Sequence, residues 1–230
     1  MARDEALLEG VGAGQSPPTL RFYQWSPPTI SLGYFQHYAE YEALPPPAGE
    51  LDVVRRQTGG GAILHDRELT YSITLPNDHT LLARGPLKLY ELAHDALIDV
   101  LRTVSVPAAR DGETDGSGAA RGPFFCFARR HKLDVLIGPD KLAGSAQRRT
   151  REAILQHGSI VLERRFEQQP AAALASLATM PAEDLAGRMT EAIRRLTGLE
   201  CTPGDWLRAE LAAAERLRAK YAGDEWTRRR

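Results

Sequence analysis

Three consecutive glycines between two predicted strands restrict the folding of this chain more than any other feature of its sequence. Residues 55–66 read RRQTGGGAILHD and lie between an apolar run at 51–54 and an alternating run at 69–75, both typical of strands. A ligand can approach the main-chain N–H groups of such a loop, and the arginines are suited to hold a carboxylate or a phosphate. A tight hairpin turn with solvated arginines explains the same residues, and the spacing matches neither a Walker A loop nor a dinucleotide fingerprint.

Length and composition predict one folded domain, or one domain with a small appendage. The chain has 230 residues, of which 43% are hydrophobic, enough for a buried core. Its net charge of −1 provides no overall field for nucleic acid or a membrane surface. No apolar run approaches the length of a membrane span, and residues 1–8 lack the apolar middle region of a signal peptide. We therefore expect a cytoplasmic protein with neither a nucleic-acid nor a membrane partner.

The cysteines and lysines are few enough to be considered one by one. Cys126 and Cys201 fit no disulfide framework and no metal-binding spacing, so we expect a reducing compartment and no metal site. The 29 basic residues include only four lysines, which are Lys88, Lys132, Lys141 and Lys220. A lysine inside a motif therefore calls for an explanation.

Periodicity predicts strands and helices along the whole chain. The predicted strands are residues 20–25, 29–34, 51–54, 69–75, 133–137, 141–149 and 153–162, the last interrupted at Gly158. The predicted helices are residues 1–9, 86–104, 181–197 and 207–221. The last two have apolar faces formed by Leu185, Met189, Ile193 and Leu196, and by Leu207, Leu211, Ala214, Leu217 and Tyr221. We expect a turn at residues 138–140 and a mobile loop at the aperiodic residues 111–122.

Cys126 is the candidate nucleophile, although most buried cysteines act only as small hydrophobic residues. A nucleophilic cysteine needs a nearby cation, and Lys141 lies close if the flanking strands form a hairpin. Residues 144–146 are small enough for a ligand to meet the backbone, or for a strand to pack closely under a helix. His157 is either a polar contact to substrate or a structural histidine.

Together these segments resemble the lipoate–protein ligase and octanoyltransferase family, a relative of the biotin–protein ligases. Residues 55–66 and 68–72 resemble the first motif, residues 141–149 the second and residues 154–160 the third. Residues 1–8, 21–25 and 221–226 also fit, so the resemblance covers nearly the whole chain. It favours a ligand-binding Gly-rich loop over a simple turn.

The resemblance implies that residues 1–230 form a single catalytic domain with an α+β fold. The implied domain has a mixed, mostly antiparallel sheet with flanking helices, and a C-terminal helix lies within residues 200–230. Cys126-Phe127 before Lys141 is similar to the cysteine-dependent octanoyltransferases that act on the glycine cleavage H protein. The implied reaction needs no cofactor: Cys126 takes octanoyl (or lipoyl) from acyl carrier protein as a thioester and passes it to a lysine of a lipoyl-carrier domain. That acceptor is the H protein or a 2-oxoacid dehydrogenase E2 subunit. Lys141 would favour the Cys126 thiolate.

The implied substrate-binding residues belong to the three motifs. They are Arg56, Thr58, Gly59, Gly60, Gly61, His65, Tyr71, Gly144, Ser145, Ala146, Gln147, His157 and Gly158.

Two features depart from the family pattern. The family usually has a strand before the helix that begins here at Met1, which implies a shortened or misassigned start. Residues 128–131 are unusually basic, which leaves the carrier preference open.

Two other functions compete with the transferase. An ATP-dependent lipoate ligase would form an acyl-adenylate with ATP and Mg²⁺, would hold phosphate with the arginines and glycines, and would not need Cys126. The chain leaves little room for the accessory domain of many such ligases. A non-catalytic module that binds a lipoyl domain or an acyl chain would need neither Cys126 nor Lys141.

Overall fold

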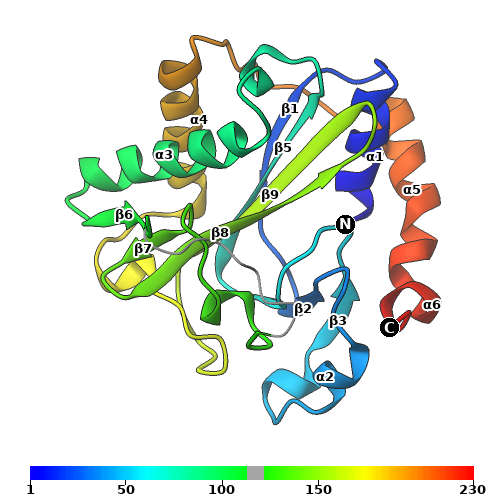
Figure 1. Cartoon of the computed structure of the whole chain (residues 1–230), viewed down its shortest axis with the longest axis vertical. Coiled ribbons are helices and arrows are strands. Elements are labelled where there is room, and N and C mark those ends of the chain that lie inside the picture. Colours follow the sequence, from blue (N-terminus) through cyan, green and yellow to red (C-terminus); the bar gives the residue numbers. More distant parts are fainter. Residues whose placement is uncertain (113–121) are drawn as a thin grey trace.

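The protein folds into two β-sheets flanked by helices (Figure 1). This computed structural model describes residues 1–112 and 122–230, so most of the loop expected to be mobile, residues 111–122, lies outside the described residues. Within the described ranges, no helix combines the length and the apolar character needed to cross a membrane. The architecture confirms the predicted α+β fold with a mostly antiparallel sheet.

The elements follow the predicted order closely. The helices are α1 Ala2–Gly12, α2 Tyr38–Glu42, α3 Leu87–Thr103, α4 Ala182–Thr197, α5 Arg208–Ala222 and α6 Asp224–Thr227. The strands are β1 Thr19–Tyr23, β2 Thr29–Leu32, β3 Asp52–Arg55, β4 Ile63–His65, β5 Glu68–Pro76, β6 Ala108–Arg110, β7 Val135–Ile137, β8 Asp140–Arg149 and β9 Ala153–Val161. The sequence did not predict β4, β6, α2 and α6, because three to five residues are too few to show a period.

The larger sheet separates two layers of helices. Its strand order is β1-β5-β9-β8-β7-β6, and every neighbouring pair is antiparallel. Side chains alternate across a strand, so Ile154 and Ile160 of β9 join the core beneath α3 and α4, whereas Leu155 packs with Leu8 and Val11 of α1. Helix α5 covers α1 on that side (Figure 1). One face of the larger sheet therefore packs into the main core, and the other packs against α1.

The predicted helix faces are only partly correct. In α4, Leu185, Met189 and Ile193 are buried as expected. Leu196 of α4 is exposed, because it lies in the last turn, beyond the part of the helix that packs against the core. Leu207 and Leu211 are also exposed, because α5 lies outside α1 rather than over the main core.

The Gly-rich segment is not the predicted hairpin between the strands on either side of it. Strand β3 pairs in parallel with β2, and the segment leads into β4, which pairs with the other edge of β2. Strand β5 belongs to the larger sheet. The loop therefore crosses from one side of the small sheet to the other and approaches the larger sheet.

The predicted break at Gly158 is also wrong, because β9 continues through it. A Cβ atom there would lie 2.5 Å from Cε1 of Tyr71 and 2.6 Å from Oγ of Ser145. Gly158 therefore gives room to a tyrosine on the neighbouring strand, without ending its own strand.

Arg55 connects three distant segments and is completely buried. Its Nε donates to the carbonyl of Thr227 at 3.0 Å, and its Nη1 donates to the carbonyls of Gly33 at 2.9 Å and Gln36 at 2.7 Å. Its own carbonyl accepts a hydrogen bond from Trp226 at 2.9 Å. The side chain therefore holds the chain after β2 and the C-terminal segment together.

We predict that Arg55→Ala lowers the free energy of unfolding by about 3 kcal/mol, because it leaves several buried carbonyls without donors. Arg55→Lys should restore only part of the loss, since one ammonium cannot reproduce the planar arrangement of guanidinium donors. Urea unfolding measures both. A loss below about 1 kcal/mol for Arg55→Ala would contradict this role.

Candidate active site

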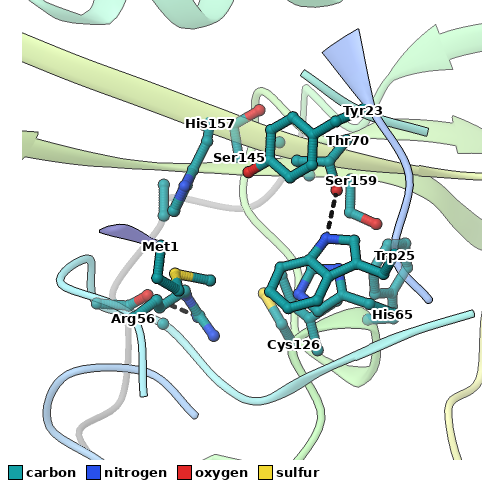
Figure 2. A pocket seen from close by; sticks show the side chains of 17 residues that line it. Met1, Tyr23, Trp25, Arg56, His65, Thr70, Cys126, Ser145, His157 and Ser159 are labelled. Carbon is teal, nitrogen blue, oxygen red and sulfur yellow. Dashed lines mark hydrogen bonds between the residues drawn. The ribbon is translucent and has the colours of Figure 1, made fainter. Parts of the chain in front are cut away.

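A cavity that is open to solvent lies between the larger sheet and the Gly-rich loop (Figure 2). Ten of the predicted site residues line it: Arg56, Gly59, Gly60, His65, Cys126, Gly144, Ser145, Ala146, His157 and Gly158. Sequence reasoning missed seven others: Met1, Tyr23, Trp25, Ile63, Thr70, Phe127 and Ser159. The lining is mainly apolar with a few polar groups, as is typical of a ligand pocket.

Cys126 is held beside the Gly-rich loop by backbone hydrogen bonds. It begins a short 3₁₀ turn, Cys126–Ala128, and its N–H donates to the carbonyl of Ala62 at 2.7 Å. The N–H of Ala62 in turn donates to the carbonyl of Phe124 at 2.8 Å. A Cβ atom on Gly61 would lie 2.9 Å from both the Cys126 nitrogen and the Phe124 oxygen. Gly61 therefore does not line the cavity but permits the approach that brings the thiol to it.

Lys141 reaches Cys126 as the sequence predicted. Its Nζ lies 3.8 Å from the Cys126 Sγ and 2.7 Å from Oδ2 of Asp134, and both Lys141 and Asp134 are buried. Burial acts to lower the pKa of Lys141, but Cys126 and Asp134 outweigh that effect and raise it above its usual value. The ammonium is therefore charged at neutral pH and close enough to stabilise a thiolate.

Asp134 is a site residue that sequence reasoning missed. Its Oδ2 accepts a hydrogen bond from the backbone N–H of His131 at 2.8 Å, which fixes the carboxylate beside Lys141. The only signal in the sequence was an acidic residue inside an otherwise apolar predicted strand. Such a residue requires a buried partner.

The arginine pair has a different role from the predicted one. The buried guanidinium of Arg56 donates to the carbonyls of Ser31 at 2.8 Å, Gly59 at 2.8 Å and Gly61 at 2.6 Å. Its Nε donates to Thr58 Oγ1 at 3.1 Å. Burial lowers the pKa of Arg56 to about 10, which leaves it charged at neutral pH. Arg56 lines the cavity, but its donors hold the glycine loop rather than an anion.

His157 belongs to a polar chain on the α1 side of the sheet. Its Nε2 lies 2.7 Å from Thr58 Oγ1, and its Nδ1 lies 3.3 Å from Oδ2 of Asp4. Because the Asp4 carboxylate only accepts, Nδ1–H donates to it, and in the neutral imidazole Nε2 then accepts from the Thr58 hydroxyl. Burial acts to raise the pKa of Asp4, but the bond from His157 and nearby positive charges hold it well below its usual range. The chain fixes the imidazole at the cavity wall.

His65 belongs to a second buried polar group. Its ring stacks on Trp25 at a centroid distance of 4.1 Å, Nε2 lies 2.8 Å from Ser31 Oγ, and Nδ1 lies 3.3 Å from Glu68 Oε1. The Trp25 indole donates to Thr70 at 3.1 Å (Figure 2). Burial lowers the pKa of His65, against the opposite effect of Glu68. Trp25 therefore presents its apolar ring to the cavity from a fixed position.

A third polar chain lies on the α3 side of the sheet. Gln156 Nε2 lies 3.1 Å from the Tyr71 hydroxyl, and that hydroxyl lies 2.5 Å from Ser145 Oγ. Ser145 Oγ in turn lies 2.6 Å from His94 Nε2. His94 Nδ1 bonds the carbonyl of Leu133, the residue before Asp134. Burial lowers the pKa of His94 to about 4, so the ring is neutral at pH 7, Nδ1 is its donor and Nε2 accepts from Ser145.

This chain explains two predicted residues that a ligand would not contact directly, Tyr71 of the first motif and Gln147 of the second. Tyr71 and Gln147 do not line the cavity; Gln147 bonds Gln156 and the carbonyl of Pro86, each at 2.8 Å. Both residues support the strands that carry Ser145 and Gly158.

The fold is that of the lipoate protein ligases. A putative lipoate protein ligase from T. acidophilum is similar over 100% of this chain and 92% of its own, with a TM-score of 0.83 and 22% identity. A lipoate-protein ligase A bound with ATP is similar over 98% of this chain and 91% of its own, with a TM-score of 0.79 and 21% identity. At these identities the likeness concerns the fold alone.

The chain belongs to the lipoyl protein ligase A/B catalytic domain family, whose model matches residues 1–196. It is 36% identical to the octanoyltransferase LipM of Kyrpidia tusciae, over 100% of this chain and 94% of the relative. It is also 36% identical to the octanoyltransferase LipM of Moorella thermoacetica, over 100% of this chain and 93% of the relative. The resemblance in the sequence motifs is thereby confirmed.

We predict that His94 makes the fold less stable in acid. Its folded pKa of about 4 lies below the usual 6.5, so between these values the unfolded chain binds a proton that the folded chain does not. The free energy of unfolding should therefore fall as the pH drops through this window, by on the order of 2 kcal/mol between about pH 7 and pH 5. Urea unfolding at both pH values measures this loss.

His94→Gln should remove that part of the pH dependence, whereas His37→Gln, at an exposed histidine, should keep it. An equal slope in His94→Gln and the unmodified protein would show that His94 does not remain neutral in the folded state.

Proposed function

We propose that this protein is an octanoyltransferase that carries the acyl group on Cys126 and transfers it to a lysine of a lipoyl-carrier domain. One observation carries the proposal: the Cys126 thiol borders the cavity, 3.8 Å from the buried ammonium of Lys141. The names of the relatives support octanoyl transfer. Further support comes from the mainly apolar cavity that the Cys126 thiol borders.

In the first step, the Cys126 thiolate attacks the carbonyl carbon of an octanoyl thioester. A new carbon–sulfur bond forms, the bond to the donor's sulfur breaks, and the donor leaves as a thiol after taking up a proton. Lys141 supports this step because its positive charge favours the thiolate over the thiol. Apolar side chains of Trp25, Ile63 and Phe127 provide a lining for the acyl chain.

In the second step, the amine of the acceptor lysine attacks the carbonyl carbon of the Cys126 thioester. An amide bond forms, the amine loses a proton, and the sulfur leaves as a thiolate, which Lys141 again stabilises. The donor we propose is octanoyl-acyl carrier protein. The acceptor is the glycine cleavage H protein or a 2-oxoacid dehydrogenase E2 subunit. No cofactor enters either step.

The arrangement of the arginines favours this reaction over an ATP-dependent ligase. In the ligase alternative Arg55 and Arg56 hold phosphate, but both guanidinium groups donate to main-chain carbonyls. A ligase would also have no use for a thiol next to a buried ammonium. A non-catalytic module would need neither residue. Because the reaction requires a free thiol, we place the protein in a reducing compartment, the cytoplasm.

We predict that incubation with octanoyl-acyl carrier protein, without ATP, adds one octanoyl group to the protein. Intact mass measures the adduct, and hydroxylamine should remove it because it is a thioester. Cys126→Ser should abolish it, and Cys201→Ser, at the other free cysteine, should keep it. An adduct that survives in Cys126→Ser, or that requires ATP, would sink the proposal.

We predict that Lys141→Ala moves the alkylation of Cys126 to higher pH. The ammonium stabilises the anionic sulfur, so its loss makes ionisation harder, and each pKa unit corresponds to about 1.4 kcal/mol. Lys141→Arg should restore the profile incompletely, because the larger guanidinium does not fit between Asp134 and Cys126 in the same way. The iodoacetamide rate, followed across pH, measures this. An unchanged profile in Lys141→Ala would assign the lysine to substrate binding only.

A further inference from the structure

Arginine and aromatic side chains from three distant parts of the sequence meet on the surface beside the Gly-rich loop. We call Tyr34, Phe35, Arg148, Arg229 and Arg230 the arginine–aromatic patch. The Arg229 guanidinium carbon lies 4.3 Å from the centre of the Tyr34 ring, and that of Arg148 lies 5.7 Å from the same ring. The Arg230 guanidinium carbon lies 5.5 Å from the Phe35 ring. Stacking of this kind holds the guanidinium groups in place without neutralising them.

The patch is positively charged and exposed. None of its three arginines forms a salt bridge with any carboxylate in residues 1–112 or 122–230, and all three are exposed. The neighbouring Arg228 differs, since it lies 3.6 Å from Glu42 and 3.4 Å from Asp224. Phe35 is 62% exposed, although a large aromatic side chain usually avoids water.

The patch borders the entrance to the cavity. A Cβ atom on Gly59 would lie 3.8 Å from the Phe35 ring, and the Tyr34 N–H donates to the carbonyl of Thr58 at 2.8 Å. Gly60 is exposed and lines the cavity, and a Cβ atom on it would lie 3.9 Å from the Cys126 Sγ.

Strand β8 continues from the cavity to the patch. Arg148 lies two residues beyond Ala146, which lines the cavity, so alternation puts both on the same face of the sheet.

We propose that the arginine–aromatic patch binds an acidic face of the carrier domain that delivers the acyl thioester. The inference rests on the proposed function, because a thioester on a carrier can reach Cys126 only if the carrier lies at the entrance. Exposed arginines that form no salt bridge within the described ranges steer an acidic partner toward the entrance. Aromatic and arginine side chains are also the types that contribute most to protein interfaces. The patch therefore combines charge complementarity with an apolar anchor at Phe35.

The test uses the double variant Arg148→Glu/Arg229→Glu, which reverses the charge of two patch arginines that do not line the cavity. The matched control is Arg195→Glu/Arg216→Glu, which changes the charge equally at exposed positions of α4 and α5 (Figure 1). The rate of Cys126 acylation is measured with octanoyl-acyl carrier protein and with octanoyl-pantetheine, which has no protein surface. Thermal unfolding confirms that both variants are folded.

We expect the patch variant to lose about tenfold or more in kcat/KM with the carrier-bound donor and to lose its dependence on salt. With octanoyl-pantetheine the change should stay below about twofold, and the control should behave as the unmodified protein with both donors. Equal losses with both donors, or no loss with the carrier, would overturn the proposal.

A loss confined to transfer from pre-acylated enzyme to the acceptor domain would assign the patch to the acceptor and would also overturn the proposal. The unmodified protein separates this inference from the proposed function. If neither donor acylates its Cys126, the transferase proposal itself fails, and the docking proposal fails with it.

Discussion

The buried guanidinium of Arg56 is the interaction on which the site depends. By donating to the carbonyls of Gly59 and Gly61 at 2.8 and 2.6 Å, it fixes a loop that has almost no side chains of its own. The fixed loop then pairs through Ala62 with the segment that carries Cys126. Charged donors make stronger hydrogen bonds than neutral ones, which suits a loop with few other contacts. The positive charge of Arg56 is thus used for positioning, and a second buried positive charge, Lys141, lies beside the same cysteine.

The polar groups around the cavity are bonded into chains that lead away from it. The chain from Asp4 to Thr58 holds His157, the group around Glu68 holds Trp25 and His65, and the chain from Gln156 to His94 supports the strands. Buried polar groups are costly unless they are hydrogen-bonded, and these groups have partners within the protein. The cavity can therefore remain mainly apolar although many polar residues surround it.

Lys141 lies between two groups that compete for its charge. The Asp134 carboxylate, 2.7 Å away, holds the ammonium in place. The Cys126 sulfur, 3.8 Å away, is close enough for the same positive charge to stabilise a thiolate. Burial strengthens both interactions because little water screens them. The carbonyl of Leu133, next to Asp134, is bonded by His94. The position of Lys141 and Asp134 thus depends partly on α3, which carries His94 and does not line the cavity.

Much of the fold and part of the site could be predicted from the sequence by itself. Period and composition determined the long strands and helices, because a continuous apolar face must be buried against a partner. The motifs determined the family, the importance of the Gly-rich loop, and Cys126 and Lys141 as a pair. Short elements such as β4 were missed because three residues carry no measurable period.

Only the tertiary structure decided which groups meet. Arg55 and Arg56 look like anion ligands in the sequence, but burial leaves them to satisfy main-chain carbonyls. Asp134 gains its importance from the return of the chain in β8, which brings Lys141 back beside it. The arginine–aromatic patch joins residues more than one hundred positions apart, such as Tyr34 and Arg148. Sequence patterns describe neighbours along the chain, whereas charge, burial and reactivity depend on neighbours in space.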